Sequence, residues 1–266
     1  MICRLLRGWV AGLAAAGFGL YALPAAANGT TLTYVGYLAG LPVMTVTATI
    51  TLPAGLKPAQ GGYTVNAEVG TTGSFAALYP YHMSIAAQGR LAQSKTQPKQ
   101  FRSVGRIYQR QESVTLNYAP DGRVDITAAP LTRQAQQAVQ TGVANGTIDP
   151  ASLVVAVVAS YATRQTCSGK FKLFDGVRRY NVMVAQTGFV DLAALQQSYY
   201  DGVATECQAT PELIQGFSNM AQNSQFYPQS ARIWLAPAIQ GLPAIPVRIE
   251  AQNALGPMLL DLVAVQ

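Results

Sequence analysis

Charged side chains are scarce in this sequence: Asp, Glu, Lys and Arg make up 11% of its 266 residues, and the formal net charge is +6. The positive residues are dispersed, and only Arg178 and Arg179 are adjacent. Nucleic-acid-binding proteins ordinarily carry a basic run or stripe, so no nucleic acid partner is expected. Half of the residues are hydrophobic, which excludes a disordered chain and supplies a sizeable core.

Histidine occurs once, as His82, and the common catalytic motifs are missing. No Gly-x-Ser-x-Gly elbow supplies a nucleophile, neither Gly-x-Gly-x-x-Gly nor the Walker spacing occurs, and one His cannot complete a zinc site. We therefore expect no catalytic residue, no metal and no cofactor, with His82 at the surface or satisfied within a strand. A pair of carboxylates of the glycosidase kind is the alternative, drawn from Asp125, Asp149, Asp175, Asp191 and Asp201.

Long hydrophobic runs are also lacking, apart from one near the start. "MICRLLR" is a short basic segment, "GWVAGLAAAGFGLYAL" is apolar, and "PAAA" offers small residues. This order is typical of a secretory signal peptide and predicts cleavage after Ala27, with removal of residues 1–27. An uncleaved anchor is the alternative, but the run is short and rich in Ala and Gly for a span. We expect a periplasmic protein that is not integral to the membrane after cleavage.

Cysteine is rare too, and two of the three cysteines, Cys167 and Cys207, lie in the mature chain. An even pair in an exported protein predicts a disulfide, because the periplasm is oxidising. Two free buried thiols are the alternative. Neither cysteine has the Cys-x-x-Cys spacing or the nearby histidine that a redox or metal site would need.

What the mature chain does contain is two-residue alternation. In "VMTVTATITL" (residues 43–52) apolar side chains alternate with threonines, and "GYTVNAEVG" (62–70) repeats the pattern. Such alternation is typical of half-buried antiparallel strands. The segments 114–126 and 171–184 each predict a hairpin around an Asp-Gly pair, and Asp175-Gly176 indicates a two-residue turn with positive φ at both positions. We expect roughly nine to twelve strands, which is typical of all-β proteins.

Two segments predict helices that pack on the sheet. "APLTRQAQQAVQTGV" (129–143) is compatible with a helix, and "TIDPASLVVAVVASYA" (147–162) is a stronger candidate. Asp149 is expected to be its N-cap, with Pro150 in the first turn. No repeat, low-complexity stretch or charge block divides the chain. The predicted fold is therefore mainly β: residues 28–266 form one domain with a large curved antiparallel sheet or half-open barrel and one or two packed helices.

Aromatic residues gather in "SFAALYPYHM" (74–83), where a proline interrupts an expected strand. Phe75, Tyr79 and Tyr81 are candidates to line the mouth of an open barrel and to contact an apolar ligand. An ordinary core role is the alternative. Arg178 is a further candidate, for a polar head group, although the arginine pair also fits a purely structural role because neighbouring strand residues point to opposite faces.

Several stretches, in this order and spacing, resemble a bacterial family named domain of unknown function 3108. The stretches are 32–43, 71–90, 97–103, 146–158, 174–184, 200–209 and 242–262, and they cover essentially the whole mature chain. The resemblance implies an exported, mostly β protein of the cell envelope and brings no catalytic set with it. Residues 208–229 are long here and are expected to hold an extra helix or loop.

Three functions remain open from the sequence. The first is a non-catalytic envelope protein that binds a lipid or other hydrophobic molecule in the concave face of the sheet. The second is a structural module that docks on an envelope protein by an edge strand. The third is a hydrolase of envelope polymers, which would bring His82 or two carboxylates together in a cleft.

Overall fold

The computed structural model describes residues 29–53, 60–93, 95–192, 199–217, 229–253 and 256–266. The expected signal peptide, residues 1–27, lies outside this described part, so its prediction is not tested. Within these residues the helices are α1 (Gly73–Leu78), α2 (Arg133–Thr141) and α3 (Pro150–Arg164). The strands are β1 (Thr30–Leu38), β2 (Leu41–Thr51), β3 (Gly61–Thr71), β4 (Tyr81–Ala92), β5 (Lys95–Ile107), β6 (Arg110–Tyr118), β7 (Val124–Ala129), β8 (Gly169–Phe174), β9 (Arg179–Asp191), β10 (Val203–Gln215), β11 (Ala231–Ala236), β12 (Ile245–Asn253) and β13 (Gly256–Val265).

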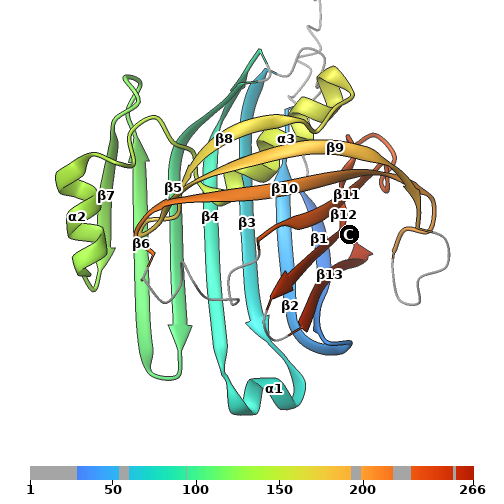
Figure 1. Cartoon of the computed structure of the whole chain (residues 1–266), viewed down its shortest axis with the longest axis horizontal. Coiled ribbons are helices and arrows are strands. Elements are labelled where there is room, and N and C mark those ends of the chain that lie inside the picture. Colours follow the sequence, from blue (N-terminus) through green and yellow to red (C-terminus); the bar gives the residue numbers. More distant parts are fainter. Residues whose placement is uncertain (1–28, 54–59, 94, 193–198, 218–228, 254–255) are drawn as a thin grey trace, which may run out of the picture.

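The strands of the described ranges belong to one antiparallel sheet of 13 strands in the order β7-β6-β5-β4-β3-β2-β1-β13-β12-β11-β10-β9-β8. Two meanders, β1–β7 and β8–β13, are thus joined where β1 pairs with β13. The sheet curls so that β8, β9 and β10 cross over the strands of the first meander (Figure 1). The predicted curved, mainly β architecture is confirmed, with more strands than expected.

Helix α3 lies between the two halves of the curled sheet, in contact with β3, β4 and β5 on one side and β8 on the other. It begins as predicted: the Asp149 side chain accepts a hydrogen bond from the Ser152 amide, and Pro150 occupies the first turn. Seven of its residues are buried, including Val155 and Ala159. The helix therefore fills one part of the space that the sheet encloses.

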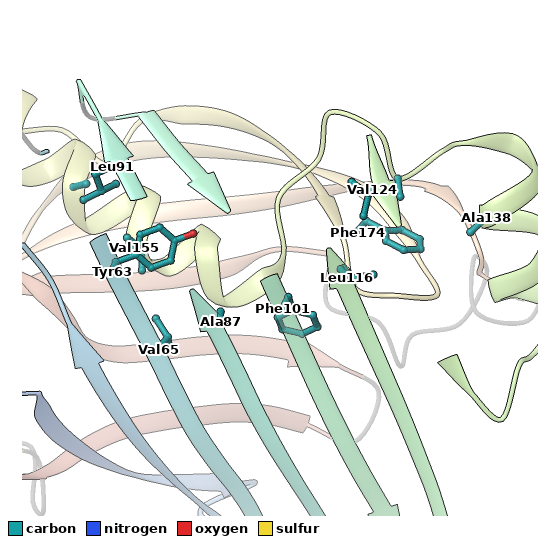
Figure 2. Packing of buried hydrophobic residues seen from close by; sticks show 12 residues of the cluster. Tyr63, Val65, Ala87, Leu91, Phe101, Leu116, Val124, Ala138, Val155 and Phe174 are labelled. Atoms are coloured by element: carbon teal, nitrogen blue, oxygen red, sulfur yellow. The ribbon is translucent and has the colours of Figure 1, made fainter. Parts of the chain in front are cut away.

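The largest core cluster joins α3 to the first meander. Figure 2 shows Tyr63 and Val65 from β3, Ala87 and Leu91 from β4, Phe101 from β5, Leu116 from β6 and Val155 from α3. Leu91 and Leu116 are fully buried. Burial of an aliphatic side chain of this size stabilises the folded state by about 2 kcal/mol, so this cluster fixes α3 against the sheet.

The predicted disulfide between Cys167 and Cys207 is confirmed. It joins the segment after α3 to β10, and both cysteines are fully buried in a cluster with Val157, Leu173 and Leu235. The bridge therefore ties the C-terminal end of α3 to the second meander.

Three local predictions need correction. The hairpin β8–β9 forms, but its connection is a four-residue loop, 175–178. In this loop Asp175 Oδ1 accepts hydrogen bonds from the amides of Val177 and Arg178. Of the Asp-Gly pair, only Gly176 has a positive φ angle. The strand expected through residues 74–79 is replaced by α1. Within 208–229, residues as far as Gln215 continue β10, and residues 218–228 lie outside the described part.

Candidate ligand-binding cavity

The sheet and α3 leave a cavity of about 1350 Å³ between them. On β2 and β3 its wall follows the alternation that the sequence predicts. The wall residues are Val46, Ala48 and Ile50 of β2, Val65 and Ala67 of β3, Met83 and Ile85 of β4, and Phe101, Ser103, Gly105 and Ile107 of β5. Every second residue of each strand points inward, so the threonines that separate the β2 residues face away from the cavity.

The inner end of the cavity is formed by α3. Pro150, Ala151 and Val154 line it there, close to the buried cluster of Figure 2. Tyr34 of β1 also lines the cavity, but its hydroxyl donates to the carbonyl of Pro246 at 2.8 Å. Burial raises the pKa of Tyr34, so this phenol remains neutral and presents an apolar ring.

Polar side chains line the cavity as well. They are the exposed Arg110 and Glu112, with Tyr81, Arg178 and other residues of the 175–178 loop, and we call this polar part the mouth. Burial is the main cause that raises the pKa of Tyr81, and the charges of Arg178 and Glu112 act on it in opposite directions. Arg178 also has its Nε atom 3.7 Å from Asp175 Oδ2. The cavity therefore combines an apolar interior with a mouth that carries charges of both signs.

Of the four residues predicted to contact a ligand, Tyr81 and Arg178 line the cavity, whereas Phe75 and Tyr79 do not. Phe75 and Tyr79 belong to α1 and its C-cap, where their rings lie 6.2 Å apart. The six-residue helix carries them beyond the ends of β3 and β4, which is why they lie outside the cavity. Ligand contact by Tyr81 and Arg178 remains a prediction.

The arginine pair is divided by the start of β9. Arg178 belongs to the loop at the cavity, while Arg179 is buried and donates to the carbonyl of Tyr180 and to Asn181 Oδ1. Burial lowers the pKa of Arg179, and the Glu212 carboxylate opposes this shift. Arg179 is therefore the one of the two arginines that has its partners on a buried face.

The polar residues considered for catalysis are distributed differently. His82 is exposed on β4, with Nε2 3.2 Å from Glu68 Oε2, which confirms the expected surface position. Asp149 is fully buried: its Oδ2 accepts from the Ser152 hydroxyl at 2.6 Å and from the Tyr118 hydroxyl at 3.5 Å. Burial raises the pKa of Asp149, and its hydrogen bonds to Ser152 oppose the shift.

No metal-binding group of three or more His, Cys, Asp or Glu side chains is found within the described ranges. In the same part of the chain, no helix has the length and hydrophobicity that a bilayer span requires.

Sequence reasoning missed the β5 wall of the cavity. Its inward residues, Phe101, Ser103, Gly105 and Ile107, include one small polar residue and one glycine, so the apolar alternation is weak there. A Cβ atom built at Gly105 would have no atom within 4 Å, which shows that this glycine faces open space. An inward position left without a side chain is a signal for a cavity, but it can be recognised only after the strand register is known.

Comparisons with known proteins address the fold and the family. A solved structure entitled beta-barrel-like protein of domain of unknown function DUF1849, from Brucella abortus, is 10% identical, covers 90% of this chain and 98% of its own, and gives a TM-score of 0.49. A DUF1329 family protein from Desulfovibrio piger is 7% identical with a TM-score of 0.20, and the match covers 91% of this chain and 86% of that one. No curated protein matches the sequence. A family model described as "Protein of unknown function (DUF3108)" matches residues 31–263, so the chain belongs to the DUF3108 family, as its motifs predicted.

Proposed function

We propose that this protein is an exported, periplasmic binding protein of the cell envelope, which holds an amphiphilic, lipid-like molecule in the cavity between the sheet and α3. The observation that carries the proposal is the cavity itself, with about 1350 Å³ of space and a mainly apolar wall. Pockets for small organic ligands usually measure about 300 to 1000 Å³, so this volume suits a long or branched hydrocarbon. An apolar cavity of this kind binds apolar matter better than water.

The distribution of polar groups sets the orientation of such a ligand. Its hydrocarbon part would lie along β2–β5 against Val154 of α3, where the lining is apolar. Its head group would meet Tyr81 and Arg178 at the mouth. An arginine offers several N–H donors to a phosphate or carboxylate, and a neutral tyrosine offers a further hydroxyl. The ligand class supported is therefore a lipid with an anionic head.

The docking-module alternative has less support from the geometry. A module of that kind is expected to have a filled interior and an unpaired edge, but here the interior is open. One of the two edge strands, β8, is also partly covered, since Ile148 donates to the carbonyl of Lys172 and accepts from the amide of Phe174. For the hydrolase alternative, His82 and Asp149 lie apart, one on the outer surface and the other in the core.

The direct test is purification of the mature protein from a native periplasm without detergent, followed by native mass spectrometry and lipid extraction. We expect a stoichiometric adduct whose mass is lost on denaturation and recovered in the lipid extract. A bare protein mass, still bare after incubation with vesicles made from envelope lipids, would contradict the proposed function.

A further inference from the structure

Large hydrophobic side chains are exposed together at one end of the molecule. Leu41 is 69% exposed and begins β2, Leu78 is 75% exposed at the end of α1, Tyr79 is 43% exposed, and Tyr108 in the β5–β6 turn is 58% exposed. We call these four residues the lip. In Figure 1, α1 and the β5–β6 turn lie at the lower end of the molecule. Single exposed hydrophobics are normal, but a group of them at one end marks an interaction surface.

Specific contacts hold the lip in place. The Tyr108 hydroxyl donates to the carbonyl of Leu78 at 2.5 Å, and the Tyr108 amide donates to the carbonyl of Pro80. The rings of Tyr79 and Tyr108 meet edge to face with centroids 6.3 Å apart. On the other side of α1, the Thr72 amide donates to the carbonyl of Val43 near the start of β2. The lip is therefore a fixed feature of three connected turns.

The lip borders the cavity. Tyr108 belongs to the lip and also lines the cavity, together with its exposed neighbours Gln109 and Arg110. Tyr81 and Ile107, which line the same end, adjoin α1 and the β5–β6 turn. A molecule that leaves the cavity at this end therefore passes the lip.

The charge of the turns that carry the lip favours one kind of partner. The turns 38–42, 73–80 and 107–110 contain no Asp or Glu, and they contain one basic residue, Arg110. Arg110 and the nearby Arg106 are both exposed. Exposed leucines insert among lipid acyl chains, tyrosines prefer the boundary between water and lipid, and arginines are attracted to anionic head groups. The lip together with these two arginines combines all three.

We propose that the lip docks on the surface of an anionic lipid bilayer, so that the cavity mouth faces the lipids from which its ligand comes. This inference rests on the proposed function and adds the source of the ligand. A second copy of the chain is a poorer fit, because a stable dimer usually buries about 1200 Å² or more and the lip offers four side chains.

The test compares vesicle binding by the mature protein, by a double variant of the lip and by a matched control. The double variant combines Leu41→Ser and Leu78→Ser, and both sites lie outside the cavity lining. The matched control is Phe189→Ser on β9, a side chain that is also 69% exposed but does not belong to the lip. All three sites are exposed, so the variants are expected to fold, and their thermal unfolding curves verify this.

Binding is measured by cosedimentation with vesicles of phosphatidylcholine and phosphatidylglycerol, and with vesicles of phosphatidylcholine alone. We expect the wild type and Phe189→Ser to bind the anionic vesicles equally. The double lip variant should bind at least about tenfold more weakly, since two leucine side chains are no longer transferred from water to lipid. Arg106→Gln should weaken binding to the anionic vesicles only. Equal binding by the lip variant and the wild type, or no binding by the wild type, would overturn the docking proposal.

A second measurement separates docking from ligand binding. A fluorescent fatty acid, added from solution, should bind the lip variant as tightly as the wild type, because the cavity is unchanged. If the wild type takes up this probe but does not bind vesicles, docking is refuted and the cavity function stands. Vesicle binding without any uptake would refute the cavity function. A wild type that dimerises in sedimentation velocity, while the lip variant is monomeric, would assign the lip to a second copy and overturn the proposal.

Discussion

The hydroxyl oxygens of Tyr63 on β3 and Ser152 on α3 lie 2.7 Å apart, in a fully buried position next to the cavity. Ser152 in turn donates to the Asp149 carboxylate, which caps α3. A single hydrogen-bonded chain therefore connects β3 to the start of α3. Because buried polar groups are costly when they lack partners, this chain fixes the position of α3 relative to β3.

Replacement of Tyr63 by phenylalanine should test this connection. The change removes one hydroxyl and leaves the ring in the core, so we expect the free energy of unfolding to fall by about 1 kcal/mol. Urea unfolding followed by circular dichroism measures it. The control is Tyr199→Phe, at a tyrosine that is 46% exposed, which should leave stability unchanged. Equal effects of the two substitutions would show that the buried bond contributes nothing.

The buried carboxyl of Asp149 should make stability depend on pH. Burial raises its pKa in the folded protein, so between the unfolded value and the folded value the folded state binds more protons than the unfolded state. Stability from this group is therefore present at low pH and is lost as pH rises through the folded pKa. Asp149→Asn keeps an oxygen that caps Ser152 and removes the charge. The unfolding free energy of the wild type minus that of Asp149→Asn should fall from about pH 4 to pH 7; a rise would contradict the shift.

Filling the cavity should abolish ligand binding without loss of stability. Gly105 faces the cavity, and a new side chain there would meet no atom within 4 Å at its Cβ. We expect Gly105→Trp to fold, because a large aromatic is favoured in a strand, and to lose binding of a fluorescent fatty acid by about tenfold or more. Ala86→Trp, at an exposed position on neighbouring β4, is the control and should bind normally. Normal binding by Gly105→Trp would place the ligand elsewhere.

The disulfide should contribute strongly to stability. Its cysteines are 40 residues apart in the sequence, and a closed loop of this length stabilises the folded state by about 4 kcal/mol in the chain-entropy account. The variant with both Cys167→Ala and Cys207→Ala should lose this amount in urea unfolding. Because both cysteines are fully buried, dithiothreitol should act on the wild type only once it unfolds. Rapid reduction of the native protein would contradict the buried geometry.

Two arginine–carboxylate pairs on neighbouring strands allow a comparison of buried and exposed charge. Arg248 donates to both oxygens of Asp261, at 2.5 and 2.6 Å, and the two side chains are 12% and 5% exposed. Asp261→Ala leaves a buried guanidinium unpaired and should cost about 3 kcal/mol. Arg232 and Glu250 form the more exposed pair, so Glu250→Ala should cost less than about 1 kcal/mol. Similar losses in urea unfolding would contradict this difference.

Much of the fold could be predicted from local patterns. The alternation of threonine with apolar residues in 43–52 established which face of β2 points inward, and Asp149-Pro150 marked the start of α3. The hairpins around Asp121 and Asp175 were also recognisable, although the second uses the Asp175 side chain in a longer loop. These features depend on neighbours in the sequence, so the sequence is sufficient to reveal them.

The features that were missed depend on distant residues or on empty space. Helix α1 has six residues, too few for a helical period to be visible, and Phe75 and Tyr79 were therefore placed in a strand. Which of Arg178 and Arg179 faces the cavity depends on where the turn ends. The cavity itself exists because α3 occupies only one part of the enclosed space, and the sequence does not indicate the unfilled part until the strand register is known.

The pairing of β1 with β13 has a consequence for the order of folding. Every other pair of neighbours in the sheet joins strands that are consecutive in the chain, whereas Leu32 pairs with Val265. Hairpins of the two meanders can form quickly by local closure, but this seam requires the slow meeting of distant segments. Until it forms, the inward faces of both meanders are exposed at once. A chain that ends before β13 would therefore form two separate partial sheets with exposed hydrophobic faces. Such a chain is expected to aggregate instead of folding into a smaller version of the native protein.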